Sequence, residues 1–278
     1  MNRSELGSTT AKGGFANELK ICEKFNNWTN DSEAKEWLKI MGYNIERIDS
    51  VTAIHIPTRI RKDALSKFNV SDDDYNEFVK FKKADAQIRI VIKIGEILKI
   101  ENLSLKKANS NADYNQIDKR TIDSYQDMWR FDDQIAVWLK LFTGEITPEQ
   151  AKKFTSEISP RDTRRVFIDE MPENIQKKII SFFENNKILV ISDILKGRGG
   201  LSADWILVTR YDKNDDSTKW ILIDINRAMN FYGSGNVMLS PHGSLYIGKI
   251  TMQRKGGTPD PTKLQFKFKP CELFSIGE

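Results

Sequence analysis

An aspartate and a lysine occur in a stretch of alternating apolar and polar residues, with Asp85 ahead of the trio Ser104-Leu105-Lys106. Side chains two residues apart share one face of a strand. We therefore expect Ser104 and Lys106 to point the same way and Leu105 to face the core. A carboxylate suits Mg²⁺, and a nearby lysine can orient water and offset developing charge. The pattern is compatible with metal-dependent hydrolysis of a phosphodiester.

Two more oxygen donors are candidates for the same site. The backbone carbonyl of Leu105 is one, and the carboxylate of Glu18 is the other. Spacing alone leaves a plainer interpretation open, in which the segment is a solvated hairpin with surface lysines.

The elements that must position these residues form a predicted β-hairpin. Residues 84–93 and 97–107 alternate, with Ile88, Ile90 and Ile92 on one face, and Ile94-Gly95-Glu96 is typical of the turn. A helix is predicted ahead of it, over about residues 14–26, because apolar residues there follow helical spacing.

Residues 116–142 predict one long helix, and the last third of the chain is rich in predicted strands. Those strands are 188–191, 203–209, 220–223, 245–252 and 263–268. We expect residues 1–278 to form one α/β domain, with a mixed sheet flanked by helices. Its catalytic hairpin would span about 84–107, and a strand-rich DNA-reading part about 187–278.

Composition excludes several classes of site. Two cysteines are too few for a disulfide framework, and with only His55 and His242 to help them we do not expect a four-ligand zinc site. Both His55 and His242 stand near prolines in loop-like contexts, so neither is expected to be catalytic. No apolar run is long enough to span a membrane, and the polar start is unlike a signal peptide. We expect a reduced cytoplasmic protein.

Positive charge is concentrated in two parts of the chain. Residues 80–120 hold ten Lys or Arg against five Asp or Glu, and residues 240–278 hold six against three. Two such segments can line one cleft for a polyanion, although scattered solvated lysines would give the same counts.

Short motifs along nearly the whole chain stand in one recognisable order. They are Gly14-Phe15-x-Asn17-Glu18, Ala84-Asp85 with Ser104-x-Lys106, Asn115-Gln116-Ile117-Asp118-Lys119, Met128-Trp129-x-Phe131-Asp132-Asp133, Gly197-Arg198-Gly199 and Gln253-Arg254-Lys255-Gly256-Gly257. This order resembles the GCGC-cutting type II restriction endonucleases of the PD-(D/E)XK superfamily.

The resemblance implies the fold, the chemistry and the partners. Asp85 would bind Mg²⁺, Lys106 would be the catalytic lysine and Glu18 would lie near the site. The substrate would be double-stranded DNA cut at a short palindrome, with GCGC favoured. A companion DNA methyltransferase would protect the host, and the enzyme would act as a monomer or weak dimer.

Two features depart from the family pattern. Ser104 stands where most of the superfamily carries Glu or Asp, which favours an action through a bound water and leaves the number of metal ions open. Extra length also separates His55 from Lys83, and its role is open.

Residues that could contact DNA are spread over three segments. Gln253, Arg254 and Lys255 offer the donors that suit guanine edges, beside glycines. Gln116 and Lys119 are expected at a helix N-terminus, which favours phosphate. Arg198, between glycines, is a further candidate.

Two alternatives remain open at this stage. One is a related nuclease with another short target, such as CCGG, or a looser repair-type specificity. The other is a sequence-specific DNA-binding protein with a decayed nuclease site, an interpretation that rests on Ser104.

Overall fold

The computed structural model describes residues 3–57, 60, 62–68, 71–73, 86–108, 114–212, 217–256 and 262–276. The chain divides into two compact units. Unit 1 comprises Met1–Asn115, Leu195–Met229 and Lys269–Glu278, and unit 2 comprises Gln116–Ile194 and Asn230–Phe268. The organisation of residues 1–278 as one domain stays a prediction. Within the described ranges, no helix has the length and apolar character needed to cross a membrane.

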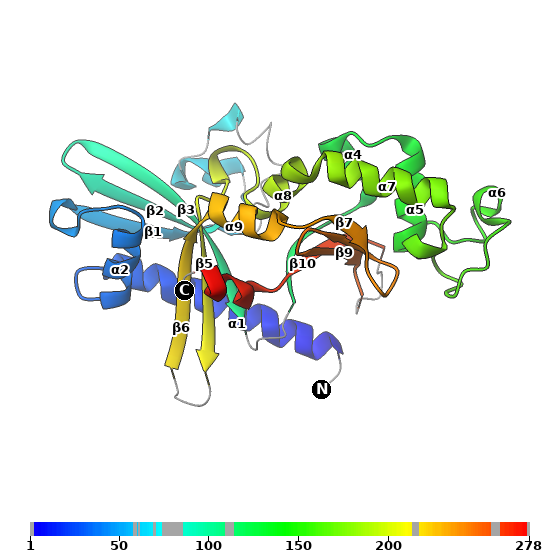
Figure 1. The fold of residues 1–278 in the computed structure, drawn as a ribbon. Helices are drawn as coiled ribbons and strands as arrows, with labels where there is room; N and C mark the ends of the chain where they lie inside the picture. The colour runs from blue at the N-terminus through cyan, green and yellow to red at the C-terminus, as the bar shows by residue number, and fades with distance from the viewer. Residues whose placement is uncertain are drawn as a thin grey trace. The chain divides into compact units, whose positions relative to one another are not determined.

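Unit 1 is built on a five-stranded sheet in the order β1-β2-β3-β5-β6. Its strands are β1 (Ser50–His55), β2 (Ala86–Ile94), β3 (Ile97–Ala108), β5 (Trp205–Asp212) and β6 (Ser217–Asp224). The β3 and β5 strands are parallel and the other neighbours antiparallel, so the sheet is mixed, as predicted. The predicted hairpin is confirmed as β2 and β3 (Figure 1).

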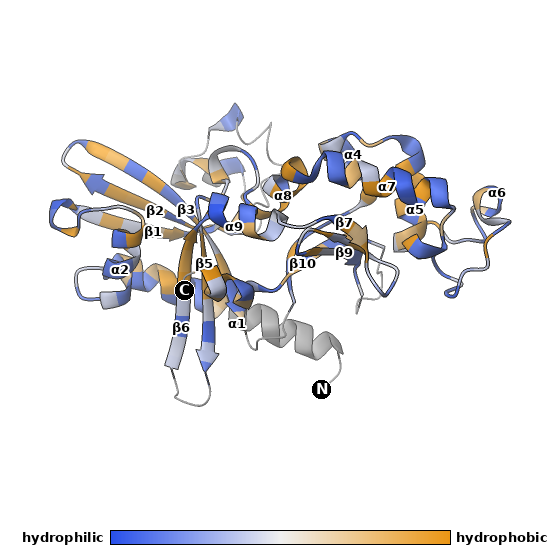
Figure 2. Ribbon diagram, viewed as in Figure 1, coloured by the Kyte–Doolittle hydropathy of each residue, from blue (hydrophilic) through white to orange (hydrophobic). Residues whose placement is uncertain are grey.

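Two helices pack their apolar residues on this sheet. They are α1 (Arg3–Asn26) and α2 (Ser32–Ile40), with the Asp31 side chain accepting from the Ala34 backbone N–H to cap α2. Ile88, Ile90 and Ile92 are fully buried beneath them, in one cluster with Phe25. Hydrophobic and hydrophilic residues alternate along β2 and β3 (Figure 2), so the other face of the hairpin carries polar residues.

Unit 2 contains a second five-stranded sheet, in the order β4-β10-β9-β8-β7. Its strands are β4 (Asn115–Arg120), which starts at the unit boundary, β7 (Val237–Leu239), β8 (Leu245–Ile247), β9 (Ile250–Arg254) and β10 (Leu264–Phe268). Helices lie before and between them: α4 (Ile122–Trp129), α5 (Asp133–Thr143), α6 (Lys152–Thr155), α7 (Glu173–Asn185) and α8 (Lys187–Leu195). The α9 helix (Ile225–Gly233) begins in unit 1 and ends in unit 2.

Short 3₁₀ helices complete the described structure. They are Ile45–Arg47, Lys62–Phe68, Ile168–Glu170, Gly199–Leu201 and Pro270–Ile276. The extra segment between His55 and Lys83 is only partly described. Among its described residues, the 3₁₀ helix Lys62–Phe68 is the one element longer than two residues.

The prediction of one long helix over residues 116–142 is wrong. Residues up to Arg120 form β4, and Thr121 then caps α4 by accepting from the Ser124 backbone N–H. Arg130 adopts a left-handed conformation that ends α4, and Asp132 caps α5 through the Ile135 N–H. Each capping side chain accepts from a backbone N–H that would bond to a carbonyl of the preceding turn in a continuous helix. The caps therefore favour two separate helices.

Two strand predictions also need correction. Residues 188–191 lie in α8 and not in a strand, because a short apolar run fits a buried helix equally well. Residues 245–252 form two strands, β8 and β9, joined by a turn at Gly248. The strands predicted at 203–209, 220–223 and 263–268 are confirmed as β5, β6 and β10.

The turn at Gly248 yields a stability prediction for unit 2. Gly248 has φ +57°, and a Cβ there would lie 2.5 Å from the Tyr232 carbonyl oxygen and 2.8 Å from that of Ser234. Since backbone atoms cannot move aside cheaply, we expect Gly248→Ala to destabilise the protein by about 3 kcal/mol or more.

Gly95→Ala is the matched control, because Gly95 also has φ +57° but nothing within 4 Å of the position that a Cβ would take. That change adds only the left-handed strain, about 1 kcal/mol. Chemical denaturation of both variants gives the comparison, and equal losses would show that the contacts at Gly248 contribute nothing.

Candidate functional site

The side chains of β3 alternate between the two faces of the sheet, as predicted. Ser104 is 1% exposed and Lys106 is 8% exposed, and both point away from the helix-covered face. Leu105, between them, belongs to the core cluster under α1 and α2. Lys107 is exposed and shares the face of Leu105. Of the two adjacent lysines, Lys106 is therefore the one held in a low-dielectric environment.

A bulge in β2 fixes the hairpin where these residues lie. The pairing shifts between Ala86, opposite Ser104, and Ile88, opposite Leu103, so Gln87 is the extra residue. The Gln87 side-chain oxygen accepts from the Leu105 backbone N–H at 2.6 Å. This bond replaces a ladder hydrogen bond and holds the Ser104-Leu105-Lys106 stretch against the end of β2. Asp85, which precedes this end, lies outside the described residues.

Glu18 lies at the same end of the sheet, paired with a histidine. Its carboxylate is 2.8 Å from His55 Nε2, and each side chain is about one-fifth exposed. His55 pairs with Ile88 in the sheet, and the next residue, Ile56, donates its backbone N–H to the Gln87 carbonyl. The pair is therefore next to the bulge that precedes Ser104, but on the sheet face that α1 covers, opposite to Ser104 and Lys106.

The expectation that His55 lies in a loop is wrong, because His55 is the last residue of β1. The nearby proline suggested a loop, whereas residues 51–56 have the pattern of a short strand, which β1 confirms. The alternation of residues 51–56, which ends beside the predicted catalytic strand, was the available signal. An edge-to-face contact with the Phe15 ring, 5.2 Å between centroids, further orients the imidazole.

The donors at this end of the sheet suit a hard cation. Glu18 offers a carboxylate, Ser104 a hydroxyl and Leu105 a carbonyl, and oxygen ligands of these kinds bind Mg²⁺. Burial raises the pKa of the Cys22 thiol to about 12, so that sulfur stays protonated and is unsuited to a soft metal. No cluster of three His, Cys, Asp or Glu that could hold a metal occurs within the described ranges, which exclude Asp85.

The buried Arg89 ties two loops to the polar face of the hairpin. Its Nε donates to Asn102 on β3 at 3.0 Å, and its guanidinium donates to the Phe68 and Gly200 carbonyls. Phe68 belongs to the extra segment, and Gly200 follows Arg198 closely. The loop of Arg198, a predicted DNA contact, is therefore anchored on the hairpin face that carries Ser104.

The other predicted DNA contacts lie in the sheet of unit 2. Gln116 and Lys119 are in β4, and Gln253 and Arg254 end β9, two strands away in the same sheet. The prediction that Gln116 and Lys119 open a helix is wrong, so the helix-dipole argument for phosphate binding does not apply to them. The structure nevertheless brings both segments into one sheet.

Successive residues of β9 point to opposite faces of the sheet. Arg254 is therefore separated from Gln253 and Lys255, the two neighbours predicted to contact bases with it. Gln253 pairs with Gln265 of β10, whose Nε2 donates to the Arg254 carbonyl at 3.1 Å. The Arg254 side chain is only 11% exposed, and its guanidinium lies 4.0 Å from Asp162. Gln253 and Lys255 are half-buried on the other face, so Arg254 cannot act beside them without moving.

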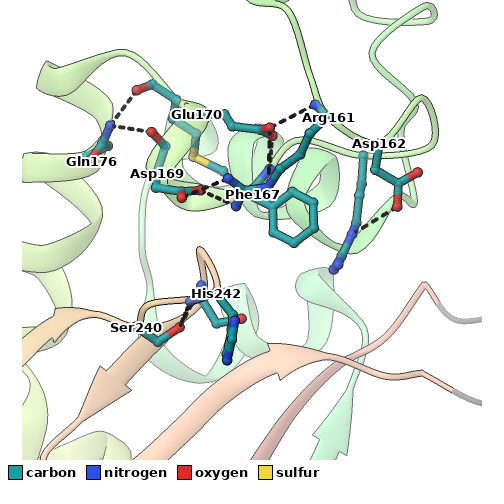
Figure 3. A network of polar contacts seen from close by, with 11 residues as sticks. Arg161, Asp162, Phe167, Asp169, Glu170, Gln176, Ser240 and His242 are labelled. Carbon is teal, nitrogen blue, oxygen red and sulfur yellow. Dashed lines mark hydrogen bonds and ion pairs between the residues drawn. The ribbon is translucent and has the colours of Figure 1, made fainter.

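Sequence reasoning also missed an arginine-rich segment of unit 2. Residues 161–165 read Arg-Asp-Thr-Arg-Arg, and Figure 3 shows Arg161, Asp162 and Phe167 in one polar network with Asp169 and Glu170. The run itself was a signal, because it holds three arginines in five residues.

Comparisons with known proteins identify the family and the fold. The family model described as "R.HinP1I restriction endonuclease" matches residues 76–274, which is most of the chain. None of the curated proteins matches the sequence. Among solved structures, the restriction endonuclease MspI in complex with its cognate DNA has a similar fold, with a TM-score of 0.58. The match has 10% sequence identity and covers 96% of this chain and 93% of that one.

The matched fold is the mixed α/β arrangement expected of a PD-(D/E)XK core, and the family match covers the hairpin and the whole strand-rich part of the chain. This chain belongs to the R.HinP1I restriction endonuclease family and is a type II site-specific nuclease.

Proposed function

We propose that this enzyme cleaves double-stranded DNA at a short palindrome, with GCGC favoured, by Mg²⁺-dependent phosphodiester hydrolysis. The observation that carries the proposal is the burial of Ser104 and Lys106 on one face of β3, at the end of the hairpin next to the bulge at Gln87. A lysine in such a low-dielectric position interacts more strongly with developing negative charge than a surface lysine does.

In this proposal, Asp85 and the Leu105 carbonyl hold Mg²⁺. When bound, the metal neutralises phosphate charge and makes hydroxide available near neutral pH. Lys106 orients the attacking water and offsets the charge that develops on the phosphate. Ser104 acts through a water, since its hydroxyl is neutral, and Glu18 accepts hydrogen bonds near the metal while His55 holds its carboxylate in place.

DNA recognition is assigned to the sheet of unit 2 and the Arg198 loop. Gln253 and Lys255 offer amide and ammonium donors from one face of β9, and Gln116 and Lys119 lie in the same sheet. Arg254 is kept as a candidate DNA contact. A cytoplasmic location, a companion methyltransferase and action as a monomer or weak dimer complete the proposal.

Incubation of the purified chain with a sequenced plasmid, with and without Mg²⁺, tests the proposal. Fragment ends would then be mapped by sequencing. Discrete Mg²⁺-dependent ends at GCGC would support both the chemistry and the target, and ends at CCGG would support the related-nuclease alternative. Scattered ends would favour a repair-type specificity and contradict a palindromic target.

Asp85→Ala separates an enzyme from a DNA-binding protein with a decayed site. We expect cleavage to disappear while a gel-shift assay still detects binding to the plasmid. A wild-type chain that binds but never cuts would support the decayed site, and Ser104→Glu would then be the change expected to restore cleavage.

Lys106→Ala is expected to lower the cleavage rate by about 10²–10³-fold, because it removes a charge positioned at the reacting phosphate. Lys107→Ala is the matched control, since it removes the same charge one residue away on the opposite face. Single-turnover cleavage of one duplex measures both. Equal rates for the two variants would exclude the proposed role of Lys106.

His55→Ala should lower cleavage by about 10–100-fold, the usual effect of losing a residue that orients a carboxylate near a metal. His242→Ala removes the chain's other histidine, which is exposed on a turn of unit 2. We expect it to leave cleavage unchanged. The loss in His55→Ala should be smaller at raised Mg²⁺, and a loss independent of Mg²⁺ would argue against support of a metal-binding carboxylate.

A further inference from the structure

Residues 161–165 of unit 2, here called the arginine turn, have a firmly held backbone. The Asp162 carboxylate accepts from the Arg164 backbone N–H at 3.0 Å, and the Asp162 carbonyl accepts from the Arg165 N–H at 3.2 Å. The Val166 N–H then donates to the Leu141 carbonyl at the end of α5, at 3.1 Å. These bonds fix where the side chains of the turn leave the backbone.

The arginines of the turn divide into one structural residue and others that share a carboxylate. Arg161 donates to both oxygens of Asp169, at 2.7 and 3.0 Å, and its guanidinium lies 4.0 Å from the Phe167 ring centroid (Figure 3). Its backbone N–H donates to Glu170 at 2.8 Å. Two acidic residues therefore fix Arg161 in the fold.

The Asp162 carboxylate faces three guanidinium groups. Its oxygens are 2.9 Å from Arg164 Nε, 3.4 Å from Arg165 Nε and 4.0 Å from Arg254 Nη1. Arg165 also stacks on the Phe167 ring, 4.0 Å from its centroid, so it is held half-buried between the ring and Asp162. Arg164 is 72% exposed and extends from this group into solvent.

Electrostatic effects within the group favour additional negative charge. The hydrogen bond from Arg164 and its charge hold the pKa of Asp162 at about 2, so the carboxylate stays ionised. Burial lowers the pKa of Arg165, and repulsion from Arg254 lowers it further. Burial likewise lowers the pKa of Arg254, with Arg164 adding repulsion. An incoming anion would relieve this mutual repulsion.

Positive charge continues along β9 beyond Arg254. The next residue, Lys255, donates its backbone N–H to the Lys263 carbonyl at 2.8 Å, and its charge contributes, after burial, to the lowered pKa of Lys267 in β10. Because Lys255 points to the face of β9 opposite Arg254, these lysines add to the positive field of unit 2 without joining the Arg254 group.

We propose that Arg164, Arg165 and Arg254 bind a backbone phosphate of duplex DNA. The inference rests on the proposed function, because it assigns the arginine turn to the same substrate. Guanidinium groups bind phosphate oxygens through paired N–H donors, and a rigid turn presents them at little entropic cost. Such a contact positions the duplex without reading its sequence.

The test measures equilibrium binding of short duplexes by full chains that carry Lys106→Ala, over a range of salt concentrations. One duplex contains the target that plasmid mapping identifies, and the other has a random sequence. Adding Arg164→Ala should weaken binding to both duplexes by the same factor, about 3–10-fold at physiological salt. The slope of log K against log[salt] should fall by about one.

Lys152→Ala is the matched control, because the Lys152 side chain is also 72% exposed in unit 2 and pairs with one carboxylate, Glu149. It should change neither the affinity nor the slope. Arg164→Glu should weaken binding more than Arg164→Ala. If thermal melting shows that the alanine variant unfolds, Arg164→Gln replaces it in the binding measurement.

Two results would overturn the inference. An unchanged salt slope in Arg164→Ala would exclude a phosphate contact, and a loss confined to the target duplex would make Arg164 a base-reading residue instead. Either result leaves wild-type plasmid cleavage intact, whereas failure of the proposed function would appear as a wild-type chain that cuts no plasmid.

Discussion

The two-residue period of β3 is the constraint on which the catalytic arrangement depends. Leu105 must be buried under α1 and α2, so its neighbours Ser104 and Lys106 must face the other way. A shift of one residue would turn Ser104 and Lys106 toward the apolar core and place Leu105 on the polar face. The bond from the Leu105 N–H to Gln87 holds the register at this position.

Lys106 and Arg89 are both buried charged residues, but one is proposed to act in catalysis and the other stabilises the fold. Arg89 donates to the Asn102 side chain and to two carbonyls, so its charge is satisfied within the fold and serves to anchor loops. Lys106 lies on the same face of the hairpin, near the bulge at Gln87. In the proposed site, the neutral Ser104 adds no charge of its own, which would leave the charge balance to the carboxylates and the metal.

Much of β3 could be predicted from sequence because apolar and polar residues alternate along much of it. The hairpin, its turn and the orientation of Leu105 all follow from that period, and they are confirmed. Residues 116–142 could not be predicted as well, because caps at Thr121 and Asp132 outweigh a continuous apolar pattern. The pairing of Glu18 with His55 and the approach of Arg254 to Asp162 join distant segments, which local patterns do not encode.

The central claim is that a metal binds at the end of the hairpin that carries Ser104 and Lys106. Its most direct test is anomalous diffraction from crystals of the Lys106→Ala chain with its duplex and Mn²⁺. The account predicts a peak within coordination distance of the Leu105 carbonyl and the Asp85 carboxylate, with Glu18 nearby. A peak elsewhere on the chain, or none beside the scissile phosphate of a bound duplex, would contradict it.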